Sequence, residues 1–190
     1  MRLILLFTLF LLTSCGIQSI PKAVNEVEAK WAEVLNQYKR RSDLIPSLVN
    51  TVKGYAAHEK ETLSAVIEAR AKATKTNINF DKLNGETLQK FQKAQGALSS
   101  ALSRLMVTVE KYPNLKANQN FLALQSQLEG TENRITVARK RYIQSIKNFN
   151  NLISVPPTSF TNSLFYHHEK KPQFTVKNVE EIQNAPKVNF

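Results

Sequence analysis

The residues before Cys15 have the types and order that lipid modification of an exported bacterial protein requires. Leu12, Thr13 and Ser14 precede this cysteine, which matches the bacterial lipobox: a leucine near the cleavage point and a small residue beside the cysteine. Small residues let the backbone enter the signal peptidase, and the thiol takes a diacylglyceryl group. Acyl chains such as palmitate anchor a protein stably when two or three are present, because each buried methylene contributes about 0.8 kcal/mol. We therefore expect Cys15 to be the lipidation site.

The segment ahead of the lipobox predicts export. Arg2 supplies a positive charge, and Leu3–Leu12 is apolar except for one threonine. This run is shorter than the roughly 20 residues that cross a bilayer, and it has the length of a signal-peptide core. We expect residues 1–14 to be a signal peptide and residues 15–21 a lipidated tether. The domain then lies outside the cytoplasm, on the cell membrane or outer membrane. The alternative is a short hydrophobic N-terminus with a chance cysteine.

Two histidine motifs are the candidates for metal chemistry. His58 and Glu59 begin like a zinc-protease helix, but the second histidine would fall at Thr62, so the motif fails. His167 and His168 are adjacent, and neighbouring residues on one chain seldom supply a full ligand set. A solvated surface pair is the simpler interpretation. We expect no metal and no cofactor.

No catalytic signature appears elsewhere, and the charge is strongly positive. The five glycines form no phosphate-binding loop, and no Gly-x-Ser-x-Gly elbow is present. Lys and Arg outnumber Asp and Glu by 26 to 15, which is compatible with contact with anionic surfaces. The basic triplets Lys39–Arg41 and Arg139–Arg141 are typical of a solvated helix face. The sequence predicts neither an enzyme nor a nucleic-acid-binding protein.

The elements that carry these residues are helices with a seven-residue apolar spacing. The first predicted helix continues to about Lys75, and Pro46 predicts a kink or restart, with Ser42 and Asp43 as N-caps. Asn84 or Glu86 opens a second helix, which ends at Pro113, and a third follows at once. The three ladders are Val24, Trp31, Tyr38, Ile45 and Val52; then Phe91, Leu98, Leu105 and Tyr112; then Phe121, Leu128, Ile135, Tyr142 and Phe149.

Short connections make successive helices antiparallel neighbours. We therefore predict an all-α fold, an antiparallel up-and-down bundle of three long helices over residues 22–154, or four if the first restarts at Pro46. Residues 155–190 form a proline-containing tail with interspersed aromatics. This tail is either an extended segment that packs partly on the bundle or a free end.

Two charged side chains fall on the core-facing seam when the ladders of the first helix are continued. These residues are Arg41 and Glu59, and each needs an opposite charge because an unpaired buried charge costs several kcal/mol. The expected partners are Arg134 for Glu59, and Glu110 or Glu132 for Arg41. Such pairs either fix the helix register or form an interaction site.

Three stretches are more particular than a generic bundle requires. They are Lys39–Val49 with Thr51–Ala56 and His58-Glu59, then Glu110–Asn118, then Thr131–Ile135 with Ala138-Arg139 and Tyr142. In this order and spacing they resemble the LemA family of bacterial envelope proteins. The resemblance covers residues 22–190 and closes with Ala185–Phe190. It implies a helical bundle held at the membrane by its N-terminus, with no catalytic residues to carry over.

The chain differs from that family in two places. Members commonly keep an uncleaved transmembrane helix, whereas this chain has a lipobox. The aromatic-Asn pairs of the last helix are weakened, since Ile143 follows Tyr142. We expect a non-catalytic interaction or scaffold protein of the envelope with a protein partner such as a membrane protease or another lipoprotein. The alternative is an electrostatic binder of anionic envelope polymer or lipid headgroups.

Overall fold

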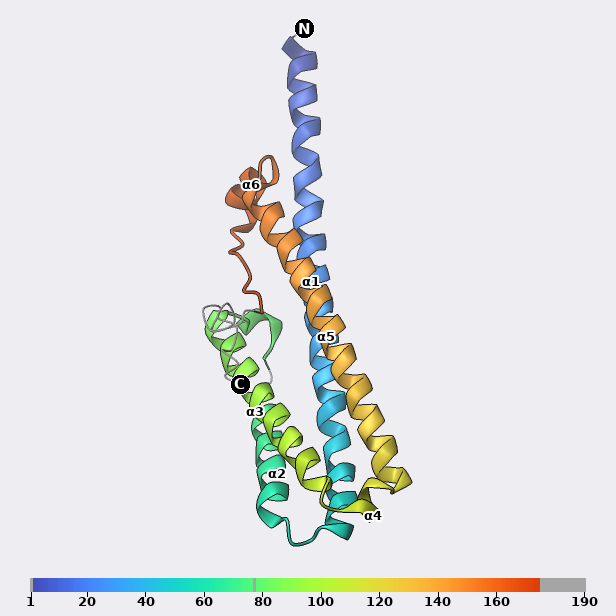
Figure 1. Ribbon diagram of the computed structural model, residues 1–190. Helices are drawn as coiled ribbons and strands as arrows, with labels where there is room; N and C mark the ends of the chain where they lie inside the picture. Colours follow the sequence, from blue (N-terminus) through green and yellow to red (C-terminus); the bar gives the residue numbers. More distant parts are fainter. Residues whose placement is uncertain (1, 77, 175–190) are drawn as a thin grey trace, which may run out of the picture.

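The computed structural model describes residues 2–76 and 78–174, with side chains described from residue 17 onward. Four long helices alternate in direction, so the predicted all-α up-and-down bundle is confirmed (Figure 1). They are α1 (Arg2–Tyr55), α2 (Lys60–Lys75), α3 (Gly85–Val109) and α5 (Gln119–Ser154). Within the described part of the chain, no helix has an apolar stretch long enough to cross a membrane.

Short elements join and end the long helices. A 3₁₀ turn precedes α3, and α4 is a single turn between α3 and α5. Beyond α5 the chain forms a short helix and then a π-helical turn, η2. Their bounds are η1 (Phe80–Lys82), α4 (Pro113–Lys116), α6 (Thr158–Thr161) and η2 (Asn162–Tyr166). The second helix of the prediction is α3, and it opens at Asn84 as expected, because the Asn84 side chain accepts a hydrogen bond from the Thr87 N–H at 2.9 Å.

The first helical segment restarts, but not at Pro46. The α1 helix runs through Pro46 to Tyr55, and α2 begins at Lys60, so the break lies about ten residues beyond the predicted position. Gly54 weakens the last turn of α1, and the small Ala56, which is 1% exposed, fits inside the tight turn. If the helix had continued straight beyond Tyr55, the residues that form α2 would project past the end of the bundle, with their apolar face in water. Burial of that face therefore decides where the helix ends.

Pro46 is tolerated because another side chain replaces the hydrogen bond that proline removes. Proline has no N–H, so the carbonyl of Ser42, four residues earlier, loses its helical donor. Arg70 of α2 donates from Nε to this oxygen at 2.8 Å. The Ser42 hydroxyl also lies 3.2 Å from the Thr74 hydroxyl of α2. The proline therefore creates a docking point for α2, and Ser42 lies inside α1 and not at an N-cap.

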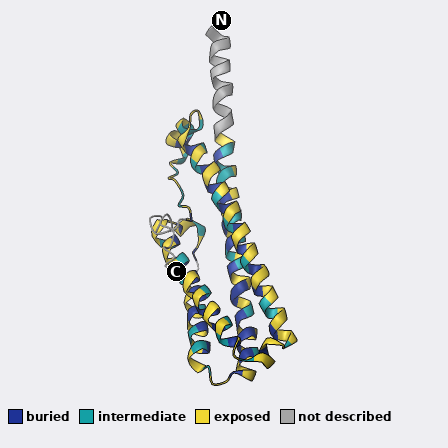
Figure 2. Ribbon diagram, in the orientation of Figure 1, coloured by how far each residue is buried: buried dark blue, intermediate teal, exposed yellow. Residues whose placement is uncertain are grey.

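The core has two apolar parts with a polar layer between them. The part near the α1–α2 turn includes Leu48, Val52, Leu98, Leu105 and Phe121. The part towards the N-terminus includes Trp31, Tyr38, Phe91, Tyr142 and Phe149. Figure 2 shows the buried residues along the facing sides of the helices. Arg41 and Gln95, buried polar residues, lie between these two parts.

The described part of the tail returns along the bundle. Phe174 is 8% exposed, and its ring centre lies 5.4 Å from that of Tyr142. The Asn150 amide holds the backbone of Lys171, accepting from its N–H at 2.9 Å and donating to its carbonyl at 3.1 Å. The predicted family ending, Ala185–Phe190, lies outside the described residues.

Candidate functional site

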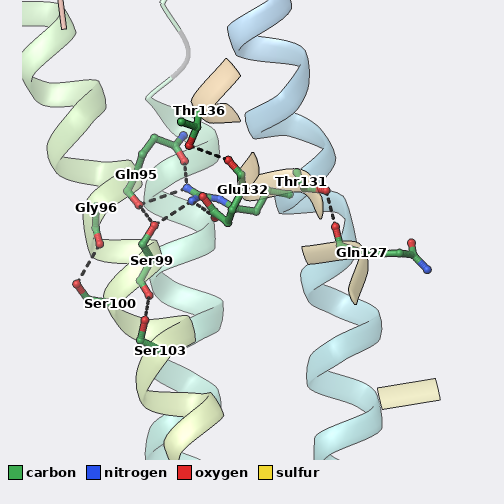
Figure 3. Close-up of polar contacts among 10 residues, drawn as sticks. Gln95, Gly96, Ser99, Ser100, Ser103, Gln127, Thr131, Glu132 and Thr136 are labelled. Carbon is green, nitrogen blue, oxygen red and sulfur yellow. Dashed lines mark hydrogen bonds and ion pairs between the residues drawn. The ribbon is translucent and has the colours of Figure 1, made fainter. Parts of the chain in front are cut away.

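A buried arginine at the centre of the bundle is the most concentrated polar site in the described chain. Arg41 of α1 is 1% exposed. Its Nη1 donates to Glu132 Oε1 at 2.6 Å and to Ser99 Oγ at 2.9 Å. Its Nη2 donates to Gln95 Oε1 at 2.6 Å and more weakly to the Gln95 carbonyl at 3.3 Å. Figure 3 shows Gln95 and Ser99 on α3 facing Glu132 on α5. We call these four residues the Arg41 layer.

The Arg41 layer connects all four long helices. Arg41 comes from α1, Gln95 from α3 and Glu132 from α5, and the Gln95 amide donates to the Ala73 carbonyl of α2 at 3.4 Å. The guanidinium also lies over the Tyr38 ring, with 5.1 Å between Cζ and the ring centre. A register shift of α1 or α3 would break several of these contacts together. The layer therefore specifies the alignment of the bundle.

Burial within the layer is unequal. The Arg41 side chain is 2% exposed, whereas that of Glu132 is 47% exposed. Among the described residues, no acceptor lies within hydrogen-bond distance of Arg41 Nε. Water thus reaches the carboxylate but not the guanidinium, and the arginine depends on its protein partners for solvation.

Two buried tyrosines of the core are held neutral, and one of them, Tyr38, lies against Arg41. Burial raises the pKa of Tyr38, although the nearby positive charges of Arg139 and Arg41 oppose this shift. Burial also raises the pKa of Tyr142, whose hydroxyl donates to the Pro172 carbonyl at 3.2 Å. Both hydroxyls therefore stay protonated at neutral pH, and that of Tyr142 acts as a hydrogen-bond donor.

Two grooves border the layer. One, of about 380 Å³, lies among α1, α2 and α3 beside Ser42, Arg70 and Gln95. The other, of about 310 Å³, lies between α3 and α5 beside Ser99 and Glu132. Over the described ranges, no three His, Cys, Asp or Glu side chains are placed to hold a metal ion. The first groove is also lined by Lys39 and Asp43, which form an exposed ion pair with 3.0 Å between Nζ and Oδ2.

Glu59 does not occupy the seam position expected for it. Because α1 ends at Tyr55, the ladder stops, and Glu59 lies half-buried ahead of α2. The Tyr112 hydroxyl donates to Glu59 Oε1 at 2.9 Å, and this hydrogen bond raises the pKa of Tyr112. The expected partner Arg134 is exposed on α5. Glu110 is paired with Lys116, which leaves Glu132 as the carboxylate that contacts Arg41.

The basic triplets are only partly solvated. Arg41 is buried, and Arg139 lies over the Phe174 ring, with 4.6 Å between Cζ and the ring centre. Arg141 binds Glu33 of α1 at 2.7 Å, so it joins α5 to α1. Some arginines of the triplets, which we expected on a solvated helix face, thus make contacts that join the helices.

The other predicted site residues lie apart from the layer. His168 stacks on Tyr166, with ring centres 5.8 Å apart, whereas His167 is exposed. The Cys15 side chain lies outside the described residues.

Sequence reasoning missed Gln95 and Ser99. Gln95 lies four residues after Phe91 and three before Leu98, a spacing that places it on the same core-facing stripe. A glutamine at such a position needs hydrogen-bond partners, so it signals a polar layer. Ser99 is one turn further along α3 and gave no separate signal.

Comparison with known proteins places these features in a family. A family model described as the LemA family matches residues 30–190. Protein LemA of Metamycoplasma hominis is 26% identical over 156 residues, which is 77% of this chain and 68% of that protein. The range matched by the family model includes the whole Arg41 layer and begins after Cys15.

Proposed function

This chain belongs to the LemA family, and from that premise we propose that it is a lipid-tethered, non-catalytic interaction protein of the bacterial envelope. The proposal has three parts: a lipid anchor at the N-terminus, a bundle without catalytic chemistry, and a protein partner. Different observations support each part.

The anchor is supported by the sequence around Cys15. The thiol follows a leucine and two small residues, and an uncharged run of signal-peptide length precedes them. The chain reaches the bundle a few residues later, since α1 contacts the other elements from about Ile17 onward. A lipid on Cys15 would hold the bundle directly at a membrane surface, on the cell membrane or outer membrane, with the domain outside the cytoplasm.

The observation that carries the non-catalytic part is the Arg41 layer. Catalytic arginines and carboxylates face a substrate, whereas both Nη atoms of Arg41 are occupied by Glu132, Ser99 and Gln95 of the same chain. The guanidinium is sealed from solvent. This arrangement aligns helices and leaves nothing at the centre of the bundle for a reaction.

The shape supports a role in presenting a surface to a partner. An α-helix rises about 1.5 Å per residue, so Tyr55 lies on the order of 60 Å along α1 from Cys15. The polar layer keeps this rod in register. The α1–α2 turn and α4 form the far end, where Tyr55 is 47% exposed. A tethered rod of this length can hold its far end away from the membrane for an envelope protein to bind.

Metabolic labelling with palmitate tests the anchor. The wild-type chain should incorporate label, and Cys15→Ala should accumulate as an unprocessed, unlabelled precursor, because the acyl-accepting thiol is absent. The matched control is Ser14→Ala, which keeps a small residue beside the cysteine and should remain labelled. Label in the Cys15→Ala chain would refute the lipid anchor.

A further inference from the structure

Exposed apolar side chains collect where the tail turns back at the end of α5. Phe160, Leu164 and Phe165 are 70%, 71% and 62% exposed, and Val155 is 56% exposed. Ile17 of α1 is 46% exposed, and its carbonyl accepts a hydrogen bond from Tyr166, the residue after Phe165. We call these five residues the apolar cap. Exposed apolar side chains that gather at one end of a molecule mark a contact surface, because water solvates them poorly.

The apolar cap is fixed to α1 by a hydrogen bond that a proline makes available. Pro21 has no N–H, so the carbonyl of Ile17 lacks its helical donor. The Tyr166 hydroxyl of η2 donates to that oxygen at 2.7 Å. The α6 helix also contacts α1 and α5, and it lies beside the N-terminal part of the bundle (Figure 1). The cap is therefore a fixed part of this end of the molecule.

Charge is absent from the segments that form this end of the molecule. Residues 15–21, which begin the proposed mature chain, and residues 148–166 contain no Asp, Glu, Lys or Arg, although 22% of the whole chain is charged. The first charges beyond these segments are Lys22 on α1, Lys147 on α5 and Glu169 followed by Lys170 in the tail. An uncharged, aromatic-containing end bordered mainly by lysines has the composition of a membrane-interface segment.

The cap also lies next to the expected anchor. Cys15 precedes Ile17 by two residues, so their Cα atoms are separated by at most about 7 Å whatever the backbone conformation. Acyl chains on Cys15 would therefore bring Ile17, and with it the cap, to the lipid surface.

We propose that the apolar cap inserts into the interfacial layer of the membrane as a second attachment beside the lipid on Cys15. This inference rests on the proposed anchor. Phe160, Leu164 and Phe165 enter the boundary between headgroups and acyl chains, and the bordering lysines contact anionic headgroups. Attachment at two points fixes the direction in which the bundle leaves the membrane, which a flexible single tether does not.

Thiol labelling of the full chain tests insertion. The purified lipoprotein is reconstituted into vesicles of phosphatidylethanolamine and phosphatidylglycerol, with a cysteine at the cap (Leu164→Cys) or at a control site (Val107→Cys). Val107 is 69% exposed, which matches Leu164, but it lies near the end of α3 by the far end. A charged, water-soluble maleimide should label position 164 at least about tenfold more slowly than position 107. Equal rates would refute insertion.

Three further measurements distinguish failure of cap insertion from failure of the lipid anchor. The wild-type chain, unfolded in denaturant, should not react with maleimide if Cys15 carries lipid, so labelling there refutes the anchor alone. The same pair of probes in a Cys15→Ala chain that lacks residues 2–14 tests the cap without the acyl chains and without the signal peptide, and slow labelling at position 164 then supports insertion independently. Protection that disappears when the protein is diluted into excess lipid would show that a second copy covers the cap, which overturns the proposal.

Discussion

Arg41→Ala should destabilise the bundle strongly, because it removes the centre of the polar layer. The change leaves Gln95 Oε1 and Ser99 Oγ without their donor and opens a cavity at a position that is 1% exposed. Breaking a buried ion pair costs about 3–5 kcal/mol. Since the Glu132 side chain is 47% exposed, water stabilises the remaining carboxylate, and we expect the low end, about 3 kcal/mol. At roughly 2–4 °C per kcal/mol for a chain of this size, the melting temperature falls by about 6–12 °C.

Urea denaturation of the full chain in detergent, followed by circular dichroism, measures this loss. Arg40→Ala is the matched control, because its side chain is exposed one residue earlier, and it should stay within about 0.5 kcal/mol of wild type. Glu132→Gln should cost about 2 kcal/mol, since the amide oxygen can still accept from Nη1 but the ion pair is lost. The chain that carries both Arg41→Ala and Glu132→Gln should lose about 1 kcal/mol less free energy of unfolding than the two single variants lose in sum. If Arg41→Ala matches Arg40→Ala, or if the two losses in the layer are additive, the alignment role is wrong.

Three other changes test the remaining contacts. Arg70→Ala should lower the free energy of unfolding by about 1 kcal/mol in the wild type but by little in a Pro46→Ala chain, because alanine at position 46 supplies the N–H that the Ser42 carbonyl lacks. Equal losses in urea denaturation would refute the docking role of Arg70. Glu59→Gln should cost under about 1 kcal/mol, since its partner Tyr112 is half-exposed, and a melting loss as large as that of Arg41→Ala would contradict this. Burial raises the pKa of Tyr142 above the ordinary tyrosine value of about 10. The stability that neutral Tyr142 contributes to the folded chain is therefore complete below about pH 10 and is lost as the pH rises towards the folded-state pKa. Tyr142→Phe should therefore lose less stability than wild type between about pH 8 and pH 11, and an unchanged slope would count against it.

The apolar part of the fold could be predicted because helical periodicity is a local property. The ladder residues Trp31, Phe91, Ile135 and Phe149 are all buried, and Arg41 lies on the seam where the ladder places it. Seven-residue spacing decides which side chains share a helix face whatever the partner helix is. The periodicity therefore predicted both the core and the charged residue that is buried within it.

The helix break, the partner of Glu59 and the position of the tail depend on contacts between segments that are distant in the sequence. Pro46 suggests a helix break, but Arg70 from α2 compensates the free carbonyl, so the helix continues. The partner of Glu59 could not be predicted, because the break after Tyr55 moves Glu59 out of the ladder. Fixation of the tail by Asn150 likewise involves residues far apart in sequence. Only the tertiary arrangement specifies these contacts.

Affinity capture of the full chain from solubilised membranes at low and at raised salt is the most direct test of the proposed interaction role. Exposed charge pairs are screened within about 10 Å at 0.1 M salt and more strongly above it. We predict that a specific envelope protein stays bound at raised salt. If everything captured at low salt is released at raised salt, or if only anionic polymer and lipid are recovered, the chain is an electrostatic binder and the proposed role is wrong.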